Sequence, residues 1–246
     1  MLVSVHEDYG ALSKAAARFV AERIGRKADL ILGLASGSTP VGMYQELIRL
    51  HRQEGLSFSN VTTFNLDEYI GLPKSHPQSF YQFMWRTFFS HIDINPQSVF
   101  VPDGMTSDIQ AHCAWYEEEI KHRGGIDLQI LGIGSNGHIG FNEPGSSQSS
   151  RTCMTRLSRQ TVRDNARFFK TIDDVPKTAI TMGIGTILEA EEILLLASGE
   201  AKAEAVRAAV EGPITAMVPA SSLQTHRKVY VMIDRAAGSK LRQLAA

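Results

Sequence analysis

The residues best suited to proton chemistry lie in the glycine-rich segment 132–144, directly after a short apolar run at 126–131. This segment carries Asn136, His138 and Glu143. A nearby carboxylate can orient an imidazole so that it acts as a general acid and base. Because loops at the C-terminal ends of strands open into the crevice of an α/β sheet, we predict that these three residues are catalytic.

The glycines of the same segment, at 132, 134 and 137, also match the dinucleotide-binding pattern G-x-G-x-x-G. That pattern opens a helix and is followed by an acidic residue for the ribose, whereas here Pro144 and Gly145 interrupt the chain. We therefore reject a dinucleotide and expect no cofactor. No H-x-H, H-x-x-x-H or H-E-x-x-H spacing occurs, so we expect no metal site either.

A second candidate for proton transfer is Asp67, which follows the apolar run 61–66. A carboxylate at the end of a strand can act as a general base, but such carboxylates also cap turns, and both interpretations remain open. The neighbouring Glu68 points the opposite way in an extended segment, so we predict a structural role for it.

Two further segments follow apolar runs and are suited to binding an anion. In 33–40, Thr39 is predicted as the N-cap of a helix with Pro40 in its first turn, and free N–H groups at such a terminus can bind a phosphoryl group. The lysine of a nucleotide-binding P-loop is missing, which argues against a nucleoside triphosphate. In 197–202, Lys202 falls in a first helical turn, where the helix dipole opposes a cation unless an anion binds there. The alternative for 33–40 is an ordinary turn without a ligand, and the alternative for Lys202 is a solvated side chain.

The elements that must position these residues alternate along the chain, which predicts parallel strands joined by crossover helices. Strands are predicted at 30–35, 61–66, 126–133, 180–184, 193–197 and 229–233, and helices at 40–51, 78–89, 109–122 and 200–211. We expect one α/β domain over residues 1–246, a Rossmann-like sandwich. It has a mostly parallel open sheet with helices on both faces, and a small lid at about 157–180.

Charge and composition favour a small-molecule substrate. The net charge is −1 with no basic cluster, which argues against nucleic-acid and membrane partners. The apolar runs are too short to span a bilayer. Cys113 and Cys153 form no C-x-x-C pair, and the N-terminus lacks a secretion signal, so we expect a cytoplasmic protein.

Several segments taken together closely resemble the glucosamine-6-phosphate deaminase family along essentially the whole chain. They are 34–40, 65–69, 71–73, 76–77, 132–144, 150–152, 165–169 and 210–212. The resemblance implies a cytoplasmic aldose-ketose isomerase that converts glucosamine 6-phosphate and water to fructose 6-phosphate and ammonia.

The resemblance also implies roles for individual residues. Asp67 would move a proton between C2 and C1 of the sugar, and His138, helped by Glu143, would open the pyranose ring. The substrate phosphate would be bound by Ser36, Gly37, Ser38, Thr39, Arg167 and Lys202, with Arg167 on the lid.

Some positions depart from the family pattern. Asn136 stands where many members have an aspartate, so we predict that the orientation of His138 depends more on Glu143. Cys153 and Thr155 replace basic residues that bind N-acetylglucosamine 6-phosphate in hexameric members, which predicts no allosteric site for that sugar. The longer C-terminal tail of those members is also missing, and we expect a monomer or small homo-oligomer.

Two other functions are compatible with parts of the sequence. A 6-phosphogluconolactonase would share the sheet and the glycine-histidine loop but would not need Asp67, and the segment 141–144 also favours the deaminase. A non-catalytic sugar-phosphate sensor is disfavoured, because no helix-turn-helix precedes residue 30 and no basic patch exists.

Overall fold

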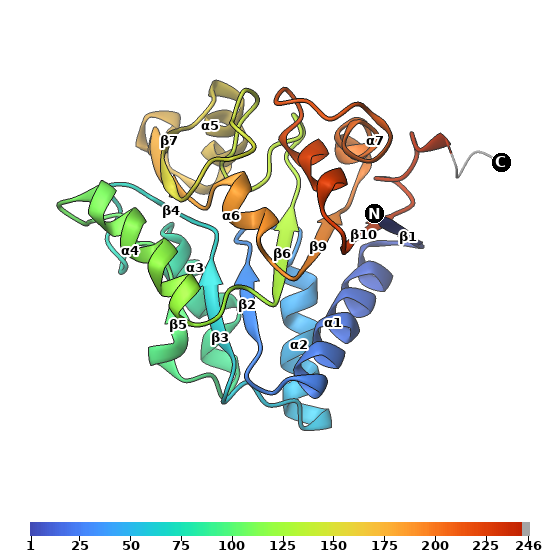
Figure 1. Ribbon diagram of the computed structural model, residues 1–246, viewed down its shortest axis with the longest axis horizontal. Helices are drawn as coiled ribbons and strands as arrows, with labels where there is room; N and C mark the ends of the chain where they lie inside the picture. Colours follow the sequence, from blue (N-terminus) through green and yellow to red (C-terminus); the bar gives the residue numbers. More distant parts are fainter. Residues whose placement is uncertain (243–246) are drawn as a thin grey trace.

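The computed structural model describes residues 1–242, which form two β-sheets and the helices around them (Figure 1). The strands are β1 Leu2–His6, β2 Ile31–Leu34, β3 Thr62–Asn65, β4 Asp67–Tyr69, β5 Val99–Phe100, β6 Leu128–Gly132, β7 Cys153–Arg156, β8 Thr178–Thr181, β9 Glu192–Ala197 and β10 Val229–Asp234. The α-helices are α1 Tyr9–Arg26, α2 Val41–Glu54, α3 Phe80–Thr87, α4 Ile109–His122, α5 Arg159–Asn165, α6 Ile184–Leu188 and α7 Ala203–Glu211. Short 3₁₀ helices cover Phe89–His91, Pro96–Ser98, Ala166–Phe168, Ile172–Asp174, Glu200–Lys202 and Pro219–Thr225.

The larger sheet has seven strands in the order β1-β10-β9-β6-β2-β3-β5, and all its pairings are parallel. From β2 the chain builds outward through β3 to β5, and then returns to the other side of β2 to form β6. The order therefore reverses between β2 and β6, which is where open α/β sheets leave a crevice at the C-terminal ends of their strands. The predicted open parallel sheet is confirmed.

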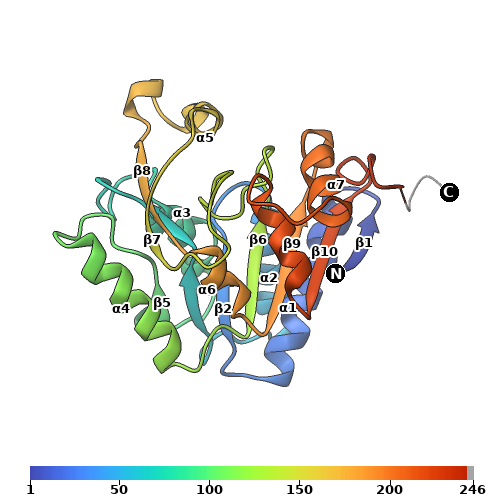
Figure 2. The same ribbon diagram turned by 45° about the horizontal axis from the view of Figure 1, so that its top comes forward.

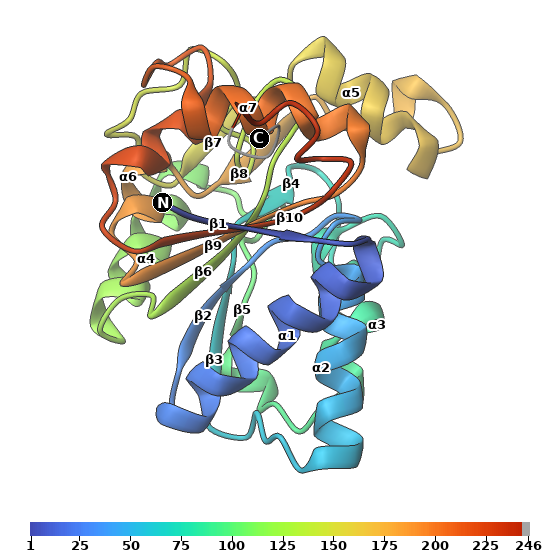
Figure 3. The same cartoon turned by 90° about the vertical axis from the view of Figure 1, so that its right-hand side faces the viewer.

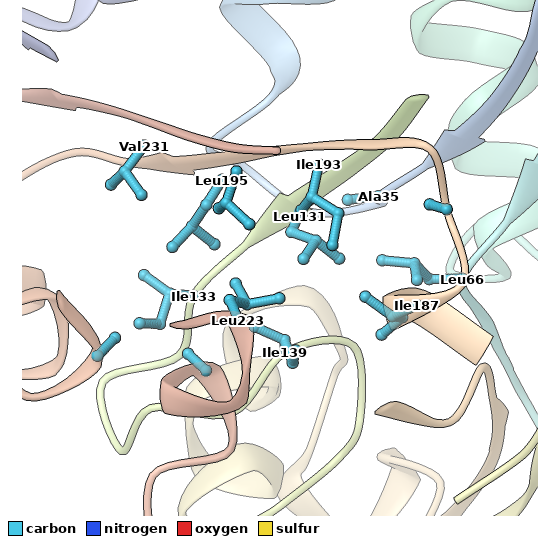
Figure 4. Close-up of a cluster of buried hydrophobic side chains, with 14 of the residues drawn as sticks. Ala35, Leu66, Leu131, Ile133, Ile139, Ile187, Ile193, Leu195, Leu223 and Val231 are labelled. Atoms are coloured by element: carbon cyan, nitrogen blue, oxygen red, sulfur yellow. The ribbon is translucent and has the colours of Figure 1, made fainter. Parts of the chain in front are cut away.

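Helices cover both faces of this sheet, as predicted. Figure 3 shows α1, α2 and α3 on one face and α4, α6 and α7 on the other. The second face buries Leu131, Ile193 and Leu195 of the strands against Ile187 of α6 and Leu223 of a 3₁₀ helix (Figure 4). Burial of such side chains supplies most of the favourable free energy of folding, at about 25 cal/mol per Å².

A second sheet is antiparallel, with the strand order β4-β8-β7. The strand predicted at 180–184 is β8, so the expectation that it joins the parallel sheet was wrong. A short apolar run shows that a strand is buried but not which neighbour it pairs with. Residues 157–177, called here the β7–β8 connection, include α5 and project beyond the sheets (Figure 2).

Four strands and, outside the predicted lid, the two helices α1 and α6 were not predicted from the sequence. Strands β1, β4, β5 and β7 are short or partly exposed, which leaves little apolar pattern to recognise. Helix α1 does bury Leu12, Ala16, Val20 and Ile24 at helical spacing. Within residues 1–242, none of the helices is long and apolar enough to cross a membrane.

Candidate active site

A cavity of about 440 Å³ opens at the C-terminal ends of β2, β3, β6 and β9, at the point where the strand order reverses. Most of the predicted site residues line it, namely Ser36, Gly37, Ser38, Thr39, Asp67, His138, Arg167 and Lys202. Asn136 and Glu143 do not line it: Asn136 contacts the lining residue His138, and Glu143 contacts Asn136 and the lining residue Thr161. The fold therefore brings together residues from four separate strand ends.

Asp67 is the first residue of β4 and pairs with Thr181 of β8. Its side chain is only 6 % exposed and accepts a 3.0 Å hydrogen bond from Ser36 Oγ at Oδ1. Burial raises the pKa of Asp67 to about 7, and the negative charge of Glu68 adds to this, while the Ser36 hydrogen bond opposes it. A carboxylate whose pKa is near neutrality can both remove and return a proton at physiological pH.

Glu68 differs from the neighbouring Asp67 in that its carboxylate binds backbone N–H groups. Its carboxylate accepts hydrogen bonds of 2.8–2.9 Å from the backbone N–H groups of Tyr69, Phe80 and Tyr81. The last two lie in the first turn of α3, whose N–H groups have no partner inside the helix. The predicted structural role is confirmed: Glu68 fixes the start of α3.

His138 is oriented by Asn136. The amide Nδ2 of Asn136 donates to Glu143 Oε2 at 2.9 Å, and its carbonyl Oδ1 lies 2.7 Å from His138 Nδ1. Since a carboxylate can only accept, the amide oxygen must face the imidazole, and Nδ1 is the protonated nitrogen. Nε2 then keeps its lone pair.

Glu143 therefore acts on His138 mainly through Asn136. The distance from Glu143 Oε2 to His138 Nδ1 is 3.6 Å, longer than the bond to the amide. The Asn136 carbonyl can accept from Nδ1 as an aspartate would, so the predicted dependence of His138 on Glu143 would act through the amide that Glu143 holds in place. Burial lowers the pKa of His138, with Glu143 opposing and Lys202 assisting, so the ring is neutral at neutral pH.

The β7–β8 connection anchors Glu143. Thr161 Oγ1 and the backbone N–H of Ser158 both donate to Glu143 Oε1. Burial alone would raise the pKa of Glu143, but the hydrogen bonds from Thr161 and Asn136 outweigh it and hold the pKa below its usual value. The histidine network is thus joined to α5.

The loop 36–39 is shaped for an anion. Gly37 has φ of 115°, which only glycine adopts without strain. Among residues 1–242, no hydrogen bond engages the N–H groups of Gly37, Ser38 or Thr39. Helix α2 begins at Val41 with Pro40 as its N-cap and no side-chain hydrogen bond, so the prediction of Thr39 as N-cap was wrong.

Tyr9 of α1 replaces the missing cap. Its hydroxyl lies 3.2 Å and 3.0 Å from the carbonyl oxygens of Ser38 and Thr39, and it accepts from Gly42 N–H at 2.7 Å. Sequence reasoning missed this residue, since nothing near Tyr9 in the chain indicates a contact with a loop so far away.

Two cations lie near this loop. Lys202 ends the 3₁₀ helix before α7, and Arg167 lies exposed in the β7–β8 connection. Burial lowers the pKa of Lys202, Asp164 opposes this, and the positive charge of Arg167 adds to it. An anion bound between the two cations would relieve their repulsion.

Several lining residues were not predicted from the sequence: Gln78, Phe80, Phe83, Arg86 and Asp164. Within residues 1–242, no group of three or more His, Cys, Asp or Glu side chains is arranged to hold a metal ion. The carboxylate, imidazole and cations that line the cavity are suited to acid–base chemistry on a small anionic molecule.

Known proteins resemble this chain along nearly all of its length. The model of the family described as glucosamine-6-phosphate isomerases/6-phosphogluconolactonase matches residues 7–232. Glucosamine-6-phosphate deaminase of Halothermothrix orenii is 51 % identical over 241 residues, which cover 98 % of this chain and 100 % of the relative. The corresponding protein of Thermoanaerobacter sp. (strain X514) is 50 % identical over 239 residues, covering 97 % and 94 %.

Solved structures agree with the sequence relatives. A monomeric glucosamine-6-phosphate deaminase superimposes with a TM-score of 0.96 at 52 % identity, covering 98 % of this chain and 100 % of that one. A 6-phosphogluconolactonase from Trypanosoma cruzi has a TM-score of 0.78 at 21 % identity, covering 98 % and 97 %. The second likeness is one of fold alone.

Proposed function

The chain belongs to the family of glucosamine-6-phosphate isomerases and 6-phosphogluconolactonases, and we propose that it is a deaminating isomerase. It converts glucosamine 6-phosphate and water to fructose 6-phosphate and ammonia. One observation carries this proposal: a buried carboxylate, Asp67, with a pKa of about 7, lines the same cavity as an oriented neutral histidine and an anion-binding loop.

The first step is opening of the pyranose ring, and His138 performs it. Its Nε2 carries a lone pair because Nδ1 is held by Asn136. Nε2 removes the proton from the C1 hydroxyl and delivers it to the ring oxygen as the C1–O5 bond breaks, which leaves an aldehyde at C1.

The aldehyde makes the neighbouring C2–H acidic, and Asp67 removes that proton. The enolate oxygen at C1 takes a proton from the C2 ammonium, and the resulting enolamine is protonated at C1 by the same carboxyl group, which moves the double bond to C2 and nitrogen. Water then adds to the C2 imine and ammonia leaves, giving the ketose. A base with a pKa near 7 suits both directions of this transfer.

We assign the substrate phosphate to the loop 36–39, where Ser36 precedes the free N–H groups of Gly37, Ser38 and Thr39. The cations Arg167 and Lys202 complete this phosphate site. The support is the set of free N–H groups and the two neighbouring charges. The β7–β8 connection acts as a lid, because it carries Arg167 and also contacts Glu143. Closure over the substrate would join phosphate binding to the histidine network.

A lactonase would need no base at C2, whereas the deaminase does. The two activities of the family can therefore be distinguished by their products. Purified protein is incubated with glucosamine 6-phosphate, without metal or nucleotide, and ammonia and fructose 6-phosphate are measured. Equal formation of the two products supports the deaminase. Hydrolysis of 6-phosphogluconolactone with neither product formed would refute it.

We further propose a cytoplasmic monomer that N-acetylglucosamine 6-phosphate does not activate. The contacts of Arg151 support the absence of activation, because Glu117 and Glu189 pair with its guanidinium, while Cys153 and Thr155 carry no positive charge. The 52 % identical solved structure, which is monomeric, supports the monomer. The expected rate curve is hyperbolic with and without that sugar, and light scattering should give the mass of one chain. A sigmoidal curve that the sugar makes hyperbolic, or a hexamer mass, would contradict the proposal.

A further inference from the structure

One face of α3 forms a wall of the cavity. Phe80, Phe83 and Arg86 all line it, and their spacing of three residues places them along one side of the helix. The first two present aromatic rings and the last a guanidinium. Arg86 is thus a third cation at the cavity, in addition to Arg167 and Lys202.

Arg86 is available to bind an anion. Its backbone carbonyl accepts a hydrogen bond from His91, but its exposed guanidinium forms no hydrogen bond or ion pair among residues 1–242. The guanidinium of Arg49, by contrast, is paired with Glu46 and Glu54. An unpaired guanidinium at the rim of a cavity attracts a negatively charged ligand without first losing a partner.

The packing of α3 brings Arg86 to the anion-binding loop. Helix α3 lies beside α2, and the ring of Phe88, which follows α3, stacks on Tyr44 of α2 at 4.8 Å between centroids. Tyr44 is about one turn from Val41, where α2 begins after the loop. Pro40 and Val41 line the cavity together with Arg86.

The position of α3 is also fixed. Glu68 accepts two N–H groups of its first turn, and Ser79 caps it. Arg86 therefore extends from a rigid helix on the α1–α2 face of the sheet, whereas α7, which follows Lys202, covers the opposite face (Figure 3).

We propose that Arg86 is a further positioning residue for the substrate's phosphate group. The inference rests on the proposed function, in which the substrate has one anionic group, the phosphate, and a cationic ammonium at C2. A guanidinium is attracted to the first and repelled by the second. Arg86 thus favours the binding mode in which the phosphate lies at the loop and C2 lies at Asp67.

The test compares Arg86→Gln, Arg86→Lys and the control Arg52→Gln. Arg52 is an exposed arginine in the last turn of α2, at the end away from the cavity. Arg86→Gln should raise KM for glucosamine 6-phosphate about 10-fold, with kcat within about twofold. The inhibition constant of inorganic phosphate should rise by the same factor. Arg86→Lys should restore most of the loss, and Arg52→Gln should change neither constant.

Unchanged KM and unchanged phosphate inhibition in Arg86→Gln would overturn the inference, as would an equal effect of Arg52→Gln. Calorimetric titration of inorganic phosphate into wild type and Arg86→Gln tests it without turnover. If the wild type does not deaminate glucosamine 6-phosphate, the proposed function fails; weaker phosphate binding in Arg86→Gln would still support the role of Arg86.

Discussion

Replacing Asp67 by asparagine should strongly reduce turnover and at the same time stabilise the protein at alkaline pH. The pKa of Asp67 is raised from 3.8 to about 7 by burial, so the folded protein holds a proton that the unfolded chain has lost. For a carboxyl group shifted in this direction, stability is lost as pH rises from the unfolded pKa to the folded one. Asparagine has nearly the same shape, carries no charge and can still accept the Ser36 hydrogen bond.

The magnitude follows from the size of the shift. About three pKa units correspond to about 4 kcal/mol of destabilisation once the carboxylate is ionised in both states, near pH 8. At pH 5 the folded carboxyl is still protonated and the cost is about 1.5 kcal/mol. Asp67→Asn should therefore exceed the wild type by about 4 kcal/mol at pH 8 but by much less at pH 5.

Urea unfolding followed by circular dichroism at both pH values measures this difference, with Asp173→Asn, an exposed acid, as the control. Turnover of Asp67→Asn should fall about 10³-fold, and the wild-type kcat/KM should rise with pH through about 7. An equal gain in stability at pH 5 and pH 8, or no gain at all, would show that burial does not destabilise the ionised carboxylate.

Three other substitutions test separate parts of the site. Asn136→Ala removes the acceptor of His138 Nδ1. In steady-state assays, kcat should fall roughly 10- to 100-fold with little change in KM. A normal kcat would mean that Glu143 alone orients the ring. Glu68→Ala leaves three backbone N–H groups without their acceptor, and urea unfolding should show a loss of about 2–3 kcal/mol. Lys202→Met should raise KM about 10-fold while kcat stays within about threefold, and an unchanged KM would remove Lys202 from the phosphate site.

The sequence was most informative where apolar runs end in polar loops. Runs of buried residues predicted β2, β3, β6, β9 and β10, and the segments that follow β3, β6 and β9 contain Asp67, His138 and Lys202. All of these meet at one cavity, because the C-terminal ends of parallel strands lie at the same edge of a sheet. A local pattern was sufficient to predict these residues, because the parallel direction of the strands places the segments after them at the same edge of the sheet.

Contacts between distant segments could not be predicted in this way. Tyr9 supports the loop before α2 from a different helix, and Arg86 reaches the cavity because α3 packs beside α2. The role of Asn136 depends on which way its amide is turned, and the position of Glu143 decides that in three dimensions. Such features follow from the packing of elements rather than from the spacing of residues.

The antiparallel pairing of β7 with β8 has a consequence for how this fold diversifies. Four residue pairs close the base of the β7–β8 connection, and Asp67 lies one strand further on, paired with Thr181. Insertions or deletions after Thr161, which together with Ser158 must stay to hold Glu143, can be absorbed above that ladder without changing the register that holds the carboxylate. Evolution, or an engineer, can thus exchange the segment that meets the outer end of a substrate while the proton-transfer chemistry is inherited unchanged.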